Sequence, residues 1–163
     1  MRALVIEADP FFAKLYGIKL KKSGLDVDTV HNGEEALQKL RLNKYAVVLM
    51  NVMLPFQDGF TVLRKSKQLH KKMPPFVIVS SLRQKEDIDK ALKLGAKQYF
   101  VRDETQLAEL MNAVVKASGK RLEKRPVKTP KKSPRKPSPM KIQRKKLSIG
   151  KKKVKKKAKT RKK

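Results

Sequence analysis

The 163-residue chain carries 43 Lys and Arg against 14 Asp and Glu, a formal charge of +29, and has no Cys and no Trp. This length predicts one folded domain with some additional chain. Disulfides and thiolate metal sites are excluded, and two histidines are too few for a histidine metal cluster. No apolar run approaches the ~18 residues that span a bilayer, and we expect no export signal at the N-terminus.

Five short apolar runs rich in Val, Ile and Leu predict five strands. Continuous apolar runs of this length are typical of strands that are buried on both faces. In chain order, the predicted strands are Ala3–Ile6, Val27–Val30, Tyr45–Met50, Phe76–Val79 and Gln98–Val101.

Segments with helical spacing separate and follow these strands. The first contains Phe12, Leu15, Tyr16 and Leu20 and has a stop signal at Gly24. The second follows Asn32-Gly33, and its acidic first turn suits the helix dipole. The other three are predicted at Asp58–Leu69, Gln84–Leu94 and Glu104–Ala117.

Strands that alternate with helices predict an α/β fold with a parallel sheet covered on both faces. Five such units in residues 1–118 predict a doubly wound (βα)5 domain of strand order 2-1-3-4-5, the flavodoxin-like arrangement. Functional groups in such sheets collect at the carboxyl ends of the strands. The polar residues expected at that edge are Glu7, Asp9, Asn51, Ser80 and Arg102.

Four blocks around these residues resemble the signature blocks of response-regulator receiver domains. They are ALVIEADP (3–10), VVLMNVMLPFQDGF (47–60), VIVSS (77–81) and GAKQYFVRD (95–103). The resemblance implies an aspartate phosphoacceptor after the third strand, an acidic pair for Mg²⁺ after the first, a hydroxyl after the fourth and a Lys after the fifth. By position, these places are held by Asn51, by Glu7 with Ala8, by Ser80 and by Arg102.

The positions that differ from the family pattern are the ones that would carry out phosphotransfer and bind Mg²⁺. The amide of Asn51 is a very poor nucleophile for forming an acyl phosphate. Asn51 and Ala8 remove two of the carboxylates that Mg²⁺ needs, which leaves Glu7 with Asp9. A planar guanidinium at Arg102 does not replace a flexible ammonium. We therefore predict a pseudo-receiver that is not an enzyme and has no metal or cofactor, with a weakened site that still binds a divalent ion as the alternative.

Residues 119–163 form a predicted second region that differs sharply in composition. From Lys120 onward there are 23 basic side chains and one acid, Glu123, and no aromatic residue. Such a segment cannot bury enough apolar surface to form a core, so we expect a disordered basic tail.

The first half of the tail contains three Ser/Thr-Pro-basic units, which begin at Thr129, Ser133 and Ser138. These units resemble the tails of linker histones, which implies contacts with the minor groove of A·T-rich DNA. The narrow, negative groove suits the flanking cations. The same three hydroxyls are predicted modification sites, because phosphorylation there would lower the tail charge.

The charge of the tail predicts DNA binding of low sequence specificity through phosphate contacts. The residues assigned to this role are Lys128, Lys131, Lys132, Arg135, Lys136, Lys141, Arg144, Lys145, Lys146, Lys151, Lys152, Lys153, Lys155, Lys156, Lys157, Lys159, Arg161, Lys162 and Lys163.

The leading interpretation is therefore a cytoplasmic, nucleoid-associated, histone-like protein of bacterial type. The face formed by 84–94, 98–101 and 104–117 corresponds to a family surface for homodimers or protein partners. The alternatives are a phosphorylation-independent transcriptional regulator and an RNA-binding protein that uses the same tail. Membrane binding is not expected, because no amphipathic face with bulky apolar residues is present.

Overall fold

The computed structural model describes residues 1–69 and 73–120. The chain divides into two units, 1–125 and 126–163, and all described residues belong to the first. The predicted tail, with its DNA-binding and modification residues, lies outside the described residues.

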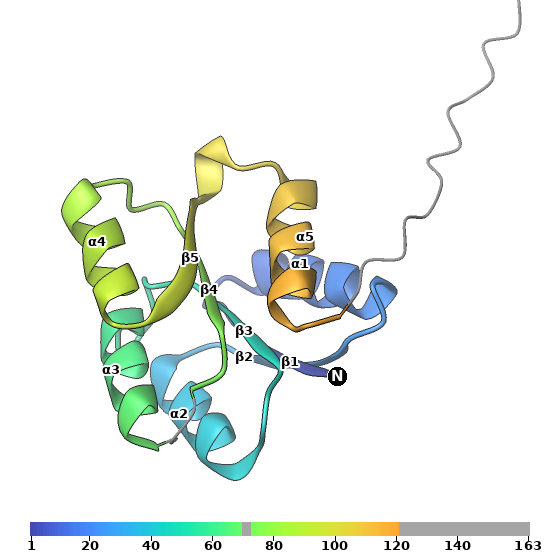
Figure 1. Ribbon diagram of the computed structural model, residues 1–163, viewed down its shortest axis with the longest axis horizontal. Helices are drawn as coiled ribbons and strands as arrows, with labels where there is room; N and C mark the ends of the chain where they lie inside the picture. Colours follow the sequence, from blue (N-terminus) through green and yellow to red (C-terminus); the bar gives the residue numbers. More distant parts are fainter. Residues whose placement is uncertain (70–72, 121–163) are drawn as a thin grey trace, which may run out of the picture. The chain divides into compact units, whose positions relative to one another are not determined.

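A five-stranded parallel sheet forms the centre of the first unit, with strand order β2-β1-β3-β4-β5 (Figure 1). The sequence prediction of the flavodoxin-like order is therefore confirmed. The strands are β1 (Arg2–Ile6), β2 (Asp26–Val30), β3 (Val47–Met50), β4 (Phe76–Ser80) and β5 (Ala96–Val101).

Five α-helices connect and follow the strands, and their observed ends are close to the predicted ones. They are α1 (Pro10–Lys22), α2 (Gly33–Leu42), α3 (Gly59–Leu69), α4 (Lys85–Lys93) and α5 (Leu107–Ala117). The largest difference is at α5, which begins three residues later than predicted. Glu104, its expected first residue, instead ends a short 3-10 helix, η1 (Arg102–Glu104), which follows β5 directly.

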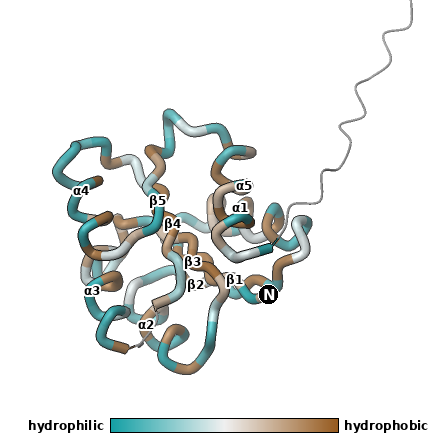
Figure 2. Tube along the Cα trace, in the orientation of Figure 1, coloured by the Kyte–Doolittle hydropathy of each residue, from teal (hydrophilic) through white to brown (hydrophobic). Residues whose placement is uncertain are grey.

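The helices cover the two faces of the sheet unequally. Alternate strand residues such as Val5 and Leu49 pack against α1 and α5. Their neighbours, such as Leu4 and Ile6, pack against α2, α3 and α4 on the other face. Figure 1 shows these two helical layers on either side of the strands, and Figure 2 shows that the central strands β3 and β4 are apolar.

Local sequence signals explain why the helices begin where they do. Asn32 accepts a hydrogen bond from the Glu35 N–H at 2.8 Å, and its side-chain amide donates to the Glu35 carboxylate at 2.9 Å. The first bond satisfies a free backbone N–H at the start of α2, and the second holds the two side chains together. Gly33 is required here, because a Cβ at this position would lie 2.1 Å from the carbonyl oxygen of Gln57.

Candidate functional site

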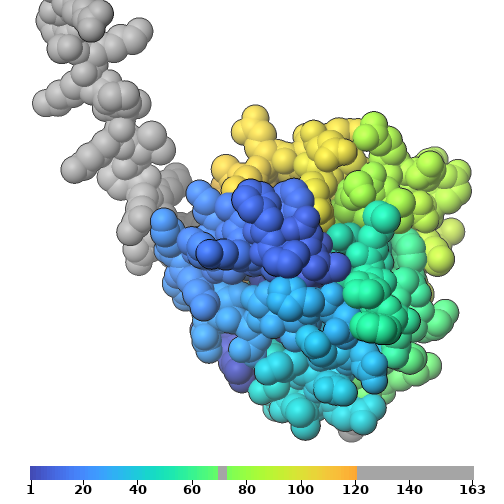
Figure 3. All heavy atoms as spheres, turned by 180° about the vertical axis from the view of Figure 1, so that it is seen from behind, coloured from blue at the N-terminus to red at the C-terminus, as the bar shows by residue number. Residues whose placement is uncertain are grey.

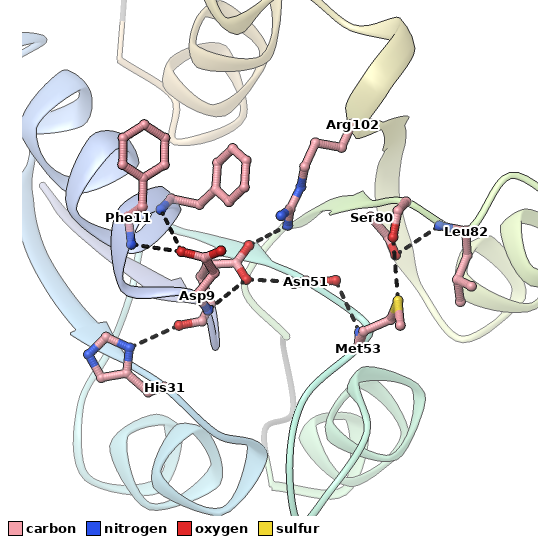
Figure 4. Close-up of polar contacts among 11 residues, drawn as sticks. Asp9, Phe11, His31, Asn51, Met53, Ser80, Leu82 and Arg102 are labelled. Atoms are coloured by element: carbon pink, nitrogen blue, oxygen red, sulfur yellow. Dashed lines mark hydrogen bonds and ion pairs between the residues drawn. The ribbon is translucent and has the colours of Figure 1, made fainter.

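The carboxyl edge of the sheet brings together side chains from strands that are far apart in the sequence. Glu7 follows β1, Asn51 follows β3 and Arg102 follows β5, and both Asn51 and Arg102 contact Glu7 (Figure 4). Ser80, at the end of β4, lies at the same edge but is not bonded to them within the part of the chain that the structure describes.

Glu7 is the central residue of this cluster and is almost completely buried, with 2% of its surface exposed. One carboxylate oxygen accepts hydrogen bonds from the Asn51 amide nitrogen at 3.0 Å and from the Asp9 N–H at 3.2 Å. The other oxygen pairs with the Arg102 guanidinium at 2.5 Å. A buried carboxylate is tolerated only when it is paired and hydrogen-bonded, and these three contacts meet that requirement.

Asn51 is satisfied at both ends of its amide. Its nitrogen donates to Glu7, and its oxygen accepts from the Met53 N–H at 3.0 Å. An aspartate at this position would have no proton to donate to Glu7 and would place a second negative charge beside it. The amide is therefore the side chain of this size that fits the buried carboxylate.

Arg102 reaches Glu7 across the top of the sheet while it packs on an aromatic ring. Its guanidinium carbon lies 4.2 Å from the centre of the Phe12 ring, which places the cation over the ring face. Figure 3 shows the segment at the start of α1, in blue, against the segment that follows β5, in yellow. The buried Nε atom of Arg102 has no hydrogen-bond partner among the described residues.

The role of Phe12 was missed by the sequence interpretation, which placed it only in the apolar pattern of the first helix. A signal was present, because Phe12 lies in the first turn of α1, directly above the edge of the sheet where the site residues collect. The guanidinium of Arg102 is thus held between a carboxylate and an aromatic face. Both contacts are ones that a planar guanidinium makes well.

Asp9 does not share the role of Glu7, contrary to the expectation that it could supply a second carboxylate to a cation site. Its carboxylate caps α1, accepting from the N–H groups of Phe11 at 2.8 Å and Phe12 at 3.4 Å. Pro10 then occupies the first helical position, where its missing N–H costs nothing. Ala8 has no polar side chain to offer.

The residues present do not fit the Mg²⁺ that the family implies. Mg²⁺ needs several hard oxygen ligands in nearly octahedral geometry. Among the described residues, Glu7 is the one buried carboxylate, and its two oxygens already bind the Asn51 amide, the Asp9 N–H and the Arg102 guanidinium. Within 1–69 and 73–120, no group of three His, Cys, Asp or Glu side chains is arranged to hold a metal ion.

Ser80 and Tyr99 form a separate set of contacts around the β4–α4 loop. The Ser80 hydroxyl oxygen accepts from the Leu82 N–H at 3.3 Å, and the Tyr99 hydroxyl donates to the Leu82 carbonyl at 2.9 Å. Burial raises the pKa of Tyr99, so this phenol stays protonated at neutral pH. Ser80 is itself fully buried and acts as a strand-end hydrogen-bonding residue.

The β3–α3 loop carries an unusual aromatic residue close to this edge. Phe56 has φ of +64°, in the left-handed region that favours glycine, and 86% of its surface is exposed. The loop then ends at Asp58, whose carboxylate accepts hydrogen bonds from the N–H and hydroxyl of Thr61 at the start of α3.

A family model described as the response regulator receiver domain matches residues 3–115. The chain belongs to the response regulator receiver domain family. The receiver identity inferred from four sequence blocks is therefore confirmed.

Several curated proteins contain a similar receiver domain. The alkaline phosphatase synthesis transcriptional regulatory protein PhoP of Bacillus subtilis is 33% identical over 122 residues, which are 75% of this chain and 50% of that protein. The cell cycle response regulator CtrA of Brucella ovis is 32% identical over 120 residues, 72% of this chain and 51% of that protein. The gliding motility regulatory protein of Myxococcus xanthus is 32% identical over 115 residues, 70% of this chain and 15% of that protein. The chain thus spans about half or less of the length of these relatives.

Solved receiver domains have the same fold over nearly their whole length. The Francisella response regulator 1452 receiver domain superposes with a TM-score of 0.67 at 26% identity, covering 72% of this chain and 96% of that one. The BeF3-activated N-terminal receiver domain of Klebsiella pneumoniae RstA gives 0.66 at 26% identity, covering 72% and 98%. Among the residues that the structure describes, no helix is both long and apolar enough to cross a bilayer.

Proposed function

We propose that this protein is a non-enzymatic receiver domain that does not accept a phosphoryl group and that serves as a protein-contact module, joined to a polybasic segment that binds DNA. The proposal that the domain accepts no phosphoryl group rests on the environment of Glu7. The amide of Asn51 and the guanidinium of Arg102 satisfy this carboxylate within the protein. Among the described residues, the one buried carboxylate of the site is therefore already paired, which makes it a poor ligand for Mg²⁺. The place after β3 carries an amide instead of the carboxylate that acyl phosphate formation needs.

The first half is tested by incubating the full chain with a small phosphodonor and Mg²⁺, followed by intact-mass analysis. We expect no added phosphoryl group. A parallel titration with beryllofluoride and Mg²⁺, followed by backbone amide shifts, should leave Glu7, Asn51, Ser80 and Arg102 unmoved. Saturable shifts at these residues, or a phosphoryl mass increase that maps to an aspartate and is released by hydroxylamine, would contradict the proposal.

The proposal that the polybasic segment binds DNA is supported by the charge of the sequence. Residues 120–163 carry 23 basic side chains, and neutralising phosphates releases condensed counterions, which makes binding favourable and strongly salt-dependent. If about ten of these cations engage, the slope of log K against log salt should be near −9 for duplex DNA. The Ser/Thr-Pro-basic units at Thr129, Ser133 and Ser138 favour A·T-rich sites, and phosphorylation there would weaken binding.

The test compares the full chain with a chain that ends at Lys120, using the same duplex at several salt concentrations. We expect tight binding at low salt by the full chain, several decades weaker binding at 200 mM, and a large loss in the shortened chain. Equal binding by both chains would refute the assignment to the tail. Preference for RNA over a duplex of equal charge would favour the RNA-binding alternative.

The site does not distinguish an architectural role in the nucleoid from that of a transcriptional regulator. Two relatives, PhoP and CtrA, are named as regulators, so a phosphorylation-independent regulator remains the second candidate. Protein partners or a homodimer would use the face of α4, β5 and α5, and a dimer would tether two tails and raise avidity. Genome-wide crosslinking separates the two roles, because uniform coverage supports the architectural role and discrete sites support the regulator.

A further inference from the structure

The topology of the fold points all five α-helices in the same sense. Each helix returns the chain from the end of one parallel strand towards the start of the next, or follows the last strand in the same direction. The helix N-termini therefore lie at the carboxyl edge of the sheet, beside Glu7 and Asn51. The helix C-termini lie at the opposite edge, where the strands begin, which we call the amino edge.

The sequence places opposite charges at these two edges. Acidic side chains in the first turns of the helices are Glu34, Glu35, Glu86, Asp87 and Glu109. Basic side chains in the last turns are Lys19, Lys21, Lys22, Lys39, Arg41, Lys67, Lys90, Lys93 and Lys116. Each charge has the sign that the helix dipole favours. Because all the helices point in the same direction, their acidic first turns lie together at the carboxyl edge and their basic last turns lie together at the amino edge.

The basic charge is densest where α1 and α5 end. These two helices share one side of the sheet and one apolar cluster. Lys19, Lys21, Lys22 and Lys116 are all exposed. Lys120 joins them, because its ammonium donates to the carbonyl oxygens of Ser23 at 2.7 Å and Gly24 at 2.9 Å, just beyond the end of α1. We call these five lysines the α1–α5 basic end.

No ion pair neutralises the charge of the α1–α5 basic end within the described part of the chain. Among residues 1–69 and 73–120, no acidic side chain forms an ion pair with any of its five lysines. Clustered like charges repel one another, and a polyanion relieves that repulsion. The basic segment of the sequence also begins at Lys120, so binding by that segment holds this end of the domain at high effective concentration near the same duplex.

We propose that the α1–α5 basic end is a second nucleic-acid contact, which binds the phosphate backbone of duplex DNA alongside the tail. This inference rests on the proposed function. The second contact also fixes how the domain is oriented on the duplex, because phosphate repels the acidic carboxyl edge, which therefore faces away from the DNA. The degenerate site at the carboxyl edge then remains accessible to proteins while the protein is bound to DNA.

The test uses the full chain and a matched pair of triple variants that remove the same charge. The first is Lys19→Gln, Lys21→Gln and Lys22→Gln at the α1–α5 basic end. The control is Arg64→Gln, Lys65→Gln and Lys85→Gln, three exposed basic residues on α3 and α4. Thermal melts verify that both variants are folded, and binding to a non-specific duplex is measured from 50 to 200 mM salt.

We expect the first variant to make the log–log salt slope shallower by about 2 to 3 and the control by less than about 1, because each lost phosphate contact changes it by about 0.9. Equal slopes for the two variants would overturn the inference and leave tail binding intact. Absence of DNA binding by the unmodified chain would instead overturn the proposed function. As a second readout, amide shifts on adding a short duplex should appear at Ser23, Gly24 and Gly119 and not at Asn51 or Ser81. Shifts confined to residues beyond 120 would also refute the contact.

Discussion

Replacing Asn51 by aspartate should restore the family's phosphoacceptor and destabilise the fold. The Asn51 amide nitrogen lies 3.0 Å from a carboxylate oxygen of Glu7. Two unit charges about 3 Å apart repel by roughly 5 to 6 kcal/mol at an effective dielectric constant of about 20. Uptake of one proton by the carboxylate pair limits this cost. At pH 7 that uptake costs about 4 kcal/mol for a carboxyl group of ordinary pKa near 4.

The expected loss for Asn51→Asp is therefore about 2 to 4 kcal/mol in the free energy of unfolding at pH 7, because the guanidinium of Arg102 offsets part of the repulsion. The loss should shrink by up to about 1.4 kcal/mol for each pH unit towards pH 5, since the proton that relieves the repulsion becomes easier to acquire. The extra titration belongs to the pair of carboxyl groups, not to either one alone.

Urea unfolding of the full chain at pH 5, 6, 7 and 8 measures this effect. Asn51→Ala is the control, since it removes the hydrogen bond to Glu7 without adding charge. Its loss should be about 1.5 to 3 kcal/mol and should not vary over this range. A variant Asn51→Asp as stable as the wild type at pH 7, or one whose deficit does not change with pH, would refute the electrostatic account of the site.

Three further predictions concern residues around the same edge. Arg102→Met should lower the free energy of unfolding, measured in urea, by about 3 to 5 kcal/mol, because it leaves the buried charge of Glu7 uncompensated. Arg102→Lys should lower it clearly less. Equal losses for the two variants would show that the packing of Arg102 on Phe12 dominates. Phe56→Gly should stabilise the fold by about 0.5 to 1 kcal/mol, since relief of the left-handed strain exceeds the entropic cost of glycine, and a lower melting temperature would reveal a packing role for the exposed ring. Burial raises the pKa of Asp58, but hydrogen bonds from Thr61 outweigh this and hold the pKa below its usual value. The stabilisation by this carboxylate is therefore present above about pH 4 and is lost as the pH falls through the lowered folded-state pKa. Asp58→Asn should make the fall in melting temperature between pH 5 and pH 3 less steep, and an unchanged profile would contradict the assignment.

The sheet could be predicted from the sequence because its strands are buried on both faces. Val47–Met50 and Phe76–Ser80 are fully buried, so both sides of each strand must be apolar and the run is continuous. The start of α5 was less predictable. Asp103 and Glu104 have the acidic character of a first helical turn, but they form η1, and α5 begins after Gln106, which makes no side-chain capping bond.

The candidate site was predicted as a set of positions but not as a set of contacts. The topology fixes which residues come to the carboxyl edge, and therefore Glu7, Asn51 and Arg102 could be named in advance. It does not fix which partner a long guanidinium selects, and Arg102 pairs with Glu7 instead of the residue after β3. The capping role of Asp9 had a readable signal in the Asp-Pro pair, but a carboxylate suits a helix cap and a cation site equally well.

The bond from Lys120 to the end of α1 has a practical consequence for defining the autonomous part of the chain. A fragment that stops where α5 ends, at Ala117, keeps every strand and α-helix that the structure describes. It would nevertheless leave the carbonyl groups of Ser23 and Gly24 without their ammonium donor. The minimal receiver therefore extends beyond its last helix, and crystallisation or spectroscopy of an isolated fragment is best begun with Lys120 retained.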